Sequence, residues 1–310
     1  MRVGYDVYGA GEPTIVLLTS WAIVHARQWK AQVPYLARRF RVITVEGRGN
    51  GRADRPGTAE AYSDQNYVDD AIAAMDATGV DRAVIAGVSM GARHALQLAA
   101  WYPERAAGVV AIGTALPWPV PPDFSVPKDS YEGWEKANMH YWLADYRGWV
   151  EFFISQVFSE PHSIKQREDA VSWGLETTAE TLLLTGPAVA APTEAEAEAM
   201  CRQVRCPVLV VHGDQDAIVP YETGVTIAQW TGGQMVTFHG GGHAPNGRDP
   251  VRTNLLIRSF AESLGPVRPE RPCIAALKSG TPKGSGVILR ARAATIRFEP
   301  PPGPASYVDA

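Results

Sequence analysis

A serine between two glycines is the first residue of this chain whose type and setting could do covalent chemistry. Residues 87–91 read Gly-Val-Ser-Met-Gly, with Ser89 at the centre, after an apolar run and before a helix-forming stretch. A glycine-bounded turn from strand to helix can hold a serine strained and exposed, and the helix N-terminus favours developing negative charge. An ordinary turn with a capping serine is the alternative, but this context favours a nucleophile.

A serine hydroxyl is a weak nucleophile and needs an adjacent base, for which His243 is the best-placed histidine. It lies in the glycine-rich stretch 239–245, after a late strand and before the final helix. His239 is the nearest competitor, although it falls closer to the end of the strand. His212 precedes an acidic loop, where we expect it to be packed or bonded locally. The remaining histidines lie outside such a loop, and of these only His25 should border the site.

The imidazole needs a carboxylate that fixes its tautomer and stabilises its charged form. Residues 212–220 supply two carboxylates after a buried strand, Asp214 and Asp216. We predict Asp216 as the acid, with Asp214 as the fallback, and we expect the other carboxylate to bond backbone N–H groups of the loop. The resulting chain order, Ser, Asp, His, is one of three orders found in unrelated serine hydrolase folds.

The composition is that of an ordinary globular protein and excludes several classes of partner. The 310 residues, 45% hydrophobic and 20% charged, suffice for one large α/β domain with an insertion. The formal charge, 29 − 33 = −4, provides no broad basic field for nucleic acid or an anionic membrane. No signal peptide or membrane span is visible, and three cysteines fit no zinc site. We expect a small-molecule partner, no metal or cofactor, and a cytoplasmic location.

Apolar runs alternate with helix-forming stretches along most of the chain, which is typical of a mostly parallel sheet with helices on both faces. The glycine-rich loop 46–52 should turn sharply over the end of that sheet. Strands are expected at residues 2–8, 14–18, 40–45, 83–87, 108–113, 207–211 and 235–238, and helices at 28–38, 63–78 and 92–101.

The alternation stops at residues 117–192, where aromatic residues are frequent and 139–157 has helical spacing. We predict that this segment is a helical cap or lid over the carboxyl ends of the strands. Most of the aromatic side chains of this segment should form its own core. A few should face a pocket, and we select Trp142 as one of these. The α/β core is then expected in 1–116 and 193–264. Residues 265–310, rich in proline and arginine, are predicted to be a tail or linker in which a strand could form at 287–298.

Together these motifs resemble the α/β-hydrolase superfamily over residues 3–264, and within it the esterase, enol-lactonase and cofactor-free haloperoxidase-like group. The resemblance implies the α/β-hydrolase fold, the triad of Ser89, Asp216 and His243, a lid and no cofactor. It does not cover the tail. The pieces that match are Trp29 with 32–34, then 40–42, 47–56, 87–91, 213–220 and 242–243.

The chain departs from this family after the strand at 14–18. Members usually carry His-Gly there, followed by a backbone N–H that helps to bind the oxyanion, whereas this chain reads Thr-Ser-Trp-Ala at 19–22. The resemblance makes Trp21 one oxyanion donor and Met90, after the nucleophile, the other. A backbone N–H survives replacement of side chains, so the hole need not be lost. The usual Asp and His of the glycine-rich loop are Glu46 and Asn50, which we interpret as structural changes.

The predicted activity is hydrolysis of small to medium, partly hydrophobic carboxylic esters through an acyl-enzyme on Ser89. Substrate contacts are expected from Trp21, Met90, His25 and Trp142. Catalysis needs a neutral imidazole, and an unperturbed imidazole has a pKa of about 6.5. Activity should therefore fall as the pH drops through that value. A lactonase or a carbon–carbon bond hydrolase with the same triad is the alternative, and a non-catalytic small-molecule receptor is less favoured. Epoxide hydrolases and dehalogenases are disfavoured because they place Asp where Ser89 stands.

Overall fold

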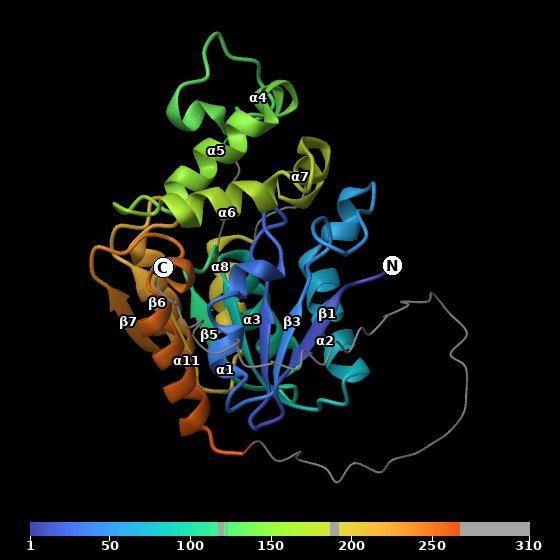
Figure 1. Cartoon of the computed structure of the whole chain (residues 1–310), viewed down its shortest axis with the longest axis vertical. Coiled ribbons are helices and arrows are strands. Elements are labelled where there is room, and N and C mark those ends of the chain that lie inside the picture. The colour runs from blue at the N-terminus through green and yellow to red at the C-terminus, as the bar shows by residue number, and fades with distance from the viewer. Residues whose placement is uncertain (117–120, 122, 187–191, 267–310) are drawn as a thin grey trace, which may run out of the picture.

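A single seven-stranded sheet organises the protein (Figure 1). The computed structural model describes residues 1–116, 121, 123–186 and 192–266. The strand order is β1-β3-β2-β4-β5-β6-β7; β1 pairs antiparallel with β3, and the other pairings are parallel. The predicted mostly parallel sheet is therefore confirmed. The strands are β1 (Tyr5–Tyr8), β2 (Ile15–Leu18), β3 (Val42–Val45), β4 (Ala83–Val88), β5 (Ala106–Ile112), β6 (Val208–Gly213) and β7 (Gln234–Phe238).

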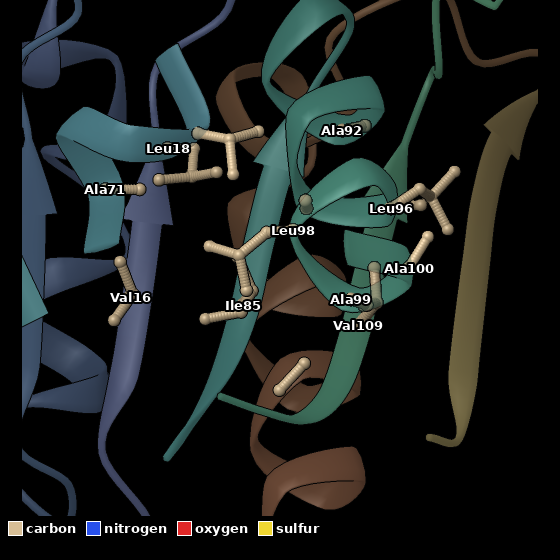
Figure 2. Close-up of a cluster of buried hydrophobic side chains, with 14 of the residues drawn as sticks. Val16, Leu18, Ala71, Ile85, Ala92, Leu96, Leu98, Ala99, Ala100 and Val109 are labelled. Atoms are coloured by element: carbon tan, nitrogen blue, oxygen red, sulfur yellow. The ribbon is translucent and has the colours of Figure 1, made fainter. Parts of the chain in front are cut away.

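Alternate residues of the central strands face opposite sides of the sheet, and each side has its own apolar cluster. On one side Val16, Leu18 and Ile85 pack against helices that include α3 (Figure 2). On the other side Ile15 and Leu17 pack with α1 and α11. The first side is covered by α2 (Asp64–Ala77), α3 (Met90–Trp101), α8 (Glu194–Cys201) and α9 (Tyr221–Thr231), and the second by α1 (Val33–Leu36) and α11 (Pro250–Ser263).

Two predicted helices are shorter than expected, each for a local reason. The stretch 28–38 forms α1 preceded by a separate 3-10 turn, η1 (Ala26–Trp29). Pro34 lies in the first turn of α1, where its missing N–H costs no helical hydrogen bond; deeper in a helix it would break one. The stretch 139–157 splits into α4 (Met139–Ala144) and α5 (Tyr146–Val157) at Asp145, whose side chain accepts from the Gly148 N–H and caps α5.

The described part of the segment between β5 and α8, called the insertion below, consists of helices and turns and contains no strand. Its helices gather at one end of the sheet in Figure 1. Trp149 stacks on Trp142 with 4.6 Å between ring centroids and contacts Phe153 at 5.2 Å, so these side chains form an aromatic core. The insertion holds η3 (Gly133–Lys136), α4, α5, α6 (Ile164–Gly174) and α7 (Ala179–Thr185).

Two short elements complete the described chain, η2 (Ala59–Tyr62) and α10 (Pro245–Arg248). The predicted tail lies outside the described residues from 267 onward, as do 117–120, 122 and 187–191 within the predicted cap. Among the helices that the structure describes, none has the length and apolar character needed to cross a membrane.

Candidate active site

Ser89 occupies the turn between β4 and α3 in a conformation that side chains rarely adopt. Its φ is 57° and its ψ is −119°, which is strained for a residue with a Cβ. The flanking positions must be glycine because a side chain at either one would collide with the backbone. A Cβ on Gly87 would lie 2.1 Å from the Gly91 carbonyl oxygen, and one on Gly91 would lie 2.2 Å from the Thr19 carbonyl oxygen. The turn that sequence analysis assigned to a nucleophile therefore has the tightness and strain expected of one.

His243 and Asp216 form a buried pair. Nδ1 of His243 lies 2.8 Å from Oδ2 of Asp216, and the side chains are 4% and 0% exposed. The other carboxylate oxygen accepts from the backbone N–H groups of Ile218 at 2.8 Å and Val219 at 2.9 Å. Burial alone would raise the pKa of Asp216, but the His243 charge and the hydrogen bonds from His212, His243 and the Val219 N–H outweigh it and hold the pKa well below its usual range. The carboxylate therefore stays ionised and can stabilise an imidazolium.

The fallback acid belongs to a different pair at the surface. Oδ2 of Asp214 lies 2.9 Å from Nδ1 of His239, whose side chain is 83% exposed, and Oδ1 accepts from the Gly240 N–H at 2.7 Å. Asp214 thus bonds loop backbone, as expected for the carboxylate left out of a triad. The competitors Asp214 and His239 pair with each other, whereas His243 pairs with Asp216.

Two cavities meet at Ser89. The larger, of about 280 Å³, is lined by Trp21, Met90 and Trp142, which were all predicted to contact substrate. The smaller, of about 90 Å³, is lined by His243. Ser89 borders both cavities, so the candidate nucleophile and base face a common space.

Aromatic side chains from the core and the insertion wall the larger cavity. Trp21 is fixed by its indole N–H, which donates to Thr185 Oγ1 at 2.7 Å. Trp149 and Phe153 on α5 also line it, and sequence analysis did not select them. Their spacing of four residues places them on one face of a helix, so a signal for a shared wall was available.

In the first turn of α3 the Ala92 and Arg93 N–H groups donate to the Ser89 carbonyl, at 3.1 and 3.2 Å. Met90 lies at the very start of the helix, where an N–H group has no acceptor within the helix and suits an oxyanion.

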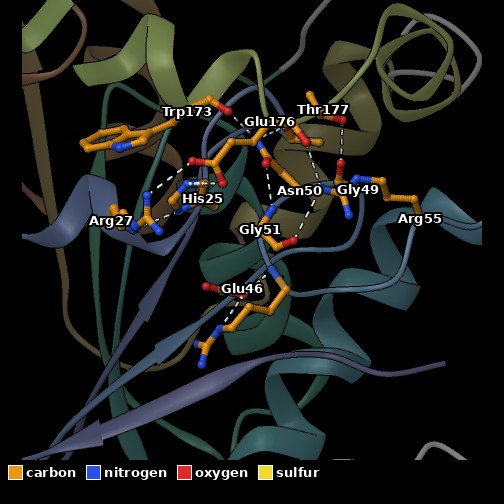
Figure 3. Close-up of polar contacts among 12 residues, drawn as sticks. His25, Arg27, Glu46, Gly49, Asn50, Gly51, Arg55, Trp173, Glu176 and Thr177 are labelled. Carbon is orange, nitrogen blue, oxygen red and sulfur yellow. Dashed lines mark hydrogen bonds and ion pairs between the residues drawn. The ribbon is translucent and has the colours of Figure 1, made fainter. Parts of the chain in front are cut away.

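His25 is the one predicted substrate contact that the structure places elsewhere. It is not among the described residues that line the two cavities at Ser89. Instead it lines a separate hollow of about 480 Å³, with Nε2 3.4 Å from Oε2 of Glu176 and its ring against Trp173 (Figure 3). Burial lowers the pKa of His25, partly opposed by the Glu176 charge. His25 is thus a residue of the junction between core and insertion.

Asn50 ties three backbone segments together at this junction (Figure 3). Its Nδ2 donates to the carbonyls of Ala22 at 2.9 Å and Trp173 at 3.3 Å, and Thr177 Oγ1 donates to the Gly49 carbonyl at 2.6 Å. Ala22 follows the predicted oxyanion donor Trp21 along the chain. The glycine-rich loop therefore joins the insertion to the loop after β2.

Within the described ranges, no group of three or more His, Cys, Asp or Glu side chains could hold a metal ion. The arrangement at Ser89 can perform nucleophilic attack, proton transfer and stabilisation of negative charge with protein groups alone.

Comparison with known proteins identifies a matching family and several similar proteins. The family model for the alpha/beta hydrolase fold matches residues 13–250. A 2-hydroxymuconate semialdehyde hydrolase from Pseudomonas sp. (strain CF600) is 27% identical over 84% of this chain and 90% of its own length. A pimeloyl-[acyl-carrier protein] methyl ester esterase from Aromatoleum aromaticum is 29% identical over 79% and 96%. The solved esterase RhEst1 from Rhodococcus sp. superposes with a TM-score of 0.71 at 24% identity, covering 85% and 95% of the two chains, and shares the fold.

Proposed function

Because the chain belongs to the alpha/beta hydrolase fold family, we propose that it is a serine carboxylic-ester hydrolase with the triad Ser89, Asp216 and His243. The observation that carries the proposal is the buried His243–Asp216 pair beside the cavity that the strained Ser89 borders. A strained serine by itself could simply belong to a tight turn, and a buried ion pair by itself could simply stabilise the fold. Their meeting at one cavity is what hydrolysis requires.

The reaction proceeds in two steps. Ser89 Oγ attacks the ester carbonyl carbon while His243 Nε2 takes its proton, and the oxyanion is held by the backbone N–H groups of Met90 and Trp21. The intermediate collapses when His243 returns that proton to the leaving alkoxide, which leaves an acyl-enzyme. Water, activated by His243, then attacks the acyl carbon and releases the acid and Ser89. Each oxyanion donor contributes on the order of 3 kcal/mol of transition-state stabilisation.

The insertion acts in this proposal as a cap that selects the substrate. Its bounds remain those expected from the sequence, 117–192, with the core in 1–116 and 193–264. Trp134, Trp142 and Trp149 of the insertion line the larger cavity, which favours small to medium, partly hydrophobic esters. The relative from Aromatoleum aromaticum, named as a methyl ester esterase, supports this bond type.

Hydrolysis of a carbon–carbon bond beside a ketone is the second candidate. It is favoured by the relative from Pseudomonas sp., a 2-hydroxymuconate semialdehyde hydrolase that aligns with most of this chain. The same triad serves both bond types, as it does lactones, so the substrate distinguishes them. A receptor that binds without turnover would have no need for the strain at Ser89.

A pH-stat assay of methyl esters from acetyl to dodecanoyl tests the proposal. The wild type should release acid from at least the shorter members, and Ser89→Ala should abolish release. Ser263→Ala, at an exposed serine near the end of α11, is the matched control and should retain the rate. No release by the folded wild type would reject the esterase assignment, and a vinylogous 1,5-diketone assayed in parallel would then test carbon–carbon cleavage.

A further inference from the structure

We propose that the two cavities at Ser89 divide the ester: the larger holds a bulky apolar acyl group, and the smaller holds a small leaving alcohol. This inference rests on the proposed function. The larger cavity is called the acyl chamber and is defined by Met90, Phe124, Trp142 and Trp149. The smaller is called the leaving-group chamber and is defined by Val24, Val157, Gln166 and His243.

The place of His243 decides which half of the ester lies where. The leaving oxygen must receive its proton from His243, so the alcohol has to lie on the histidine side of the scissile bond. His243 lines the leaving-group chamber and is not among the described residues of the acyl chamber. Met90, whose N–H is a proposed oxyanion donor, lines the acyl chamber. The carbonyl therefore sits at Ser89, between the two, with its carbon chain directed away from His243.

The size and lining of the acyl chamber determine which acyl groups the enzyme should accept. An apolar cavity of about 150 Å³ holds one benzene molecule. The acyl chamber, of about 280 Å³, has room for nearly twice that volume. No charged side chain is among the described residues that line it. Aromatic walls reward apolar surface and penalise an unpaired charge, so the acid should be aromatic or a medium-length aliphatic chain without a charged substituent.

The leaving-group chamber is smaller, and most of the described residues that line it are apolar. Its volume of about 90 Å³ is that of roughly three water molecules at ~30 Å³ each. Asn246 in its wall is 3% exposed, and its amide oxygen has no hydrogen-bond partner among the described residues. That oxygen is itself shielded within the wall, so the small volume of the chamber limits the leaving alcohol. Lys30 and Asp169, also in the wall, are paired with each other and present no free charge.

Two isomeric esters with the linkage reversed test the division directly. 2-Hydroxyethyl naphthylacetate places the ring on the acyl side, and naphthylmethyl 3-hydroxypropanoate places it on the alcohol side. The wild type should show a kcat/KM at least about tenfold higher for the first, a typical penalty for one misfitting group in a shaped pocket. Equal values or a reversed preference would overturn the division. Absence of turnover on both isomers and on the methyl esters would instead reject the proposed hydrolase function.

Substitutions in each chamber test the two halves of the proposal separately. Ala137→Trp should fill part of the acyl chamber and reduce the preference between the isomers, whereas Leu143→Trp, exposed on α4, should leave it unchanged. Ala31→Leu should fill part of the leaving-group chamber and lower kcat/KM more for a 2-hydroxyethyl ester than for the methyl ester of the same acid. Selectivity that neither Ala137→Trp nor Ala31→Leu changes in folded protein would contradict the assignment of both chambers.

A separate observation concerns the carboxylate of the triad, and from it we infer that His212 is a positioning residue for Asp216. His212 is fully buried on β6, with Nε2 3.1 Å from Oδ2 of Asp216 and 3.1 Å from the Val219 carbonyl oxygen. Oδ2 is the same oxygen that contacts His243. Nδ1 of His212 has no hydrogen-bond partner among the described residues and packs against Gly224. The ring proton therefore belongs on Nε2, where both acceptors lie.

This second imidazole does two things to the carboxylate. Together with the backbone N–H groups of Ile218 and Val219, it fixes the plane of the carboxylate so that Oδ2 faces His243. It also shares Oδ2 with His243, which weakens the pull of that oxygen on the His243 proton. The other titratable ring recorded against His212 is that of Tyr221, edge-on at 6.1 Å.

The pH profile of kcat/KM separates positioning from a purely structural role. His212→Phe should move the acid limb to higher pH, because Oδ2 then interacts with His243 alone, and should lower kcat. His212→Gln, which can keep an N–H near Oδ2, should restore a midpoint near that of the wild type. If both variants lower thermal stability but leave the midpoint where it was, His212 is structural only and the inference is wrong.

Discussion

The core and the insertion hold their parts of the site by different means. Asp216 in the core is bonded through both carboxylate oxygens, and Ser89 is fixed by a turn that only glycines fit. Trp149 and Phe153 in the insertion are held by ring contacts and burial. Hydrogen bonds and steric limits impose one geometry, whereas apolar packing tolerates exchange of similar shapes. From this difference we propose that the core determines the reaction and the insertion determines the substrate.

The largest effect is expected from the carboxylate of the core. Asp216→Asn should lower kcat/KM by on the order of 10³- to 10⁴-fold, because the imidazole loses its tautomer and its counter-charge. Asp214→Asn is a matched change on the same loop and should cost less than about threefold, since Asp214 pairs with an exposed histidine. Steady-state kinetics on one methyl ester measures both. Similar losses for the two variants would contradict the assignment of the acid.

A substitution in the insertion should alter stability and selectivity more than chemistry. Trp149→Ala removes a side chain that is 1% exposed and should cost about 3 kcal/mol or more of unfolding free energy. It should also lower kcat/KM more for a dodecanoyl than for an acetyl ester, because the ring lines the acyl chamber. Denaturant unfolding and paired kinetics report the two effects. Equal loss on both esters would remove the distinction between core and insertion.

The junction should contribute a modest dependence of stability on pH. Burial lowers the pKa of His25 below its ordinary value of about 6.5, so the unfolded chain binds a proton that the folded chain does not. Stability should therefore fall as the pH drops below about 6.5. The pKa of Asp216 is also lowered, so its contribution is present above about pH 4 and is lost in stronger acid. His25→Gln should flatten the melting-temperature profile between pH 7 and 5, and an unchanged slope would exclude His25 as its source.

The smallest effect is expected in the alkylation of the buried cysteine of the core. Cys201 is fully buried on α8, and burial raises its thiol pKa to about 12, while that of the half-buried Cys206 is raised to about 11. Iodoacetamide at pH 8 should therefore modify Cys201 only when the protein unfolds, since the thiolate is the reactive form. Peptide mapping of native and urea-treated protein checks this. Rapid native labelling of Cys201 would show that the core opens far more readily than its packing indicates.

The sheet could be predicted from the sequence, and the residues proposed for the reaction could be selected from it, because both kinds of signal are local. Apolar runs of strand length, a glycine-bounded serine and a histidine in a glycine loop each carry their own physical cause. The helix over 63–78 was also found, as α2, with Ser63 capping it through the Asn66 N–H. These features need no knowledge of distant contacts.

What could not be predicted depends on contacts between distant segments. His25 was expected at the substrate, but its ring is drawn to Glu176, which lies about 150 positions away in the chain. The contact of His212 with Asp216 depends on how the loop after β6 folds back, and the alignment of Phe153 with Trp21 depends on where α5 docks. Periodicity gives the face of a helix but does not give its partner.

Labelling with a fluorophosphonate tests the central claim most directly, because the reagent needs an activated serine and no knowledge of the substrate. The wild type should gain one adduct, mapped by peptide mass spectrometry to Ser89. His243→Ala should slow labelling by orders of magnitude because the base is lost, and Ser89→Ala should abolish it. An adduct on another serine, or none on the folded wild type, would contradict the account of Ser89 as a nucleophile activated by His243 and Asp216.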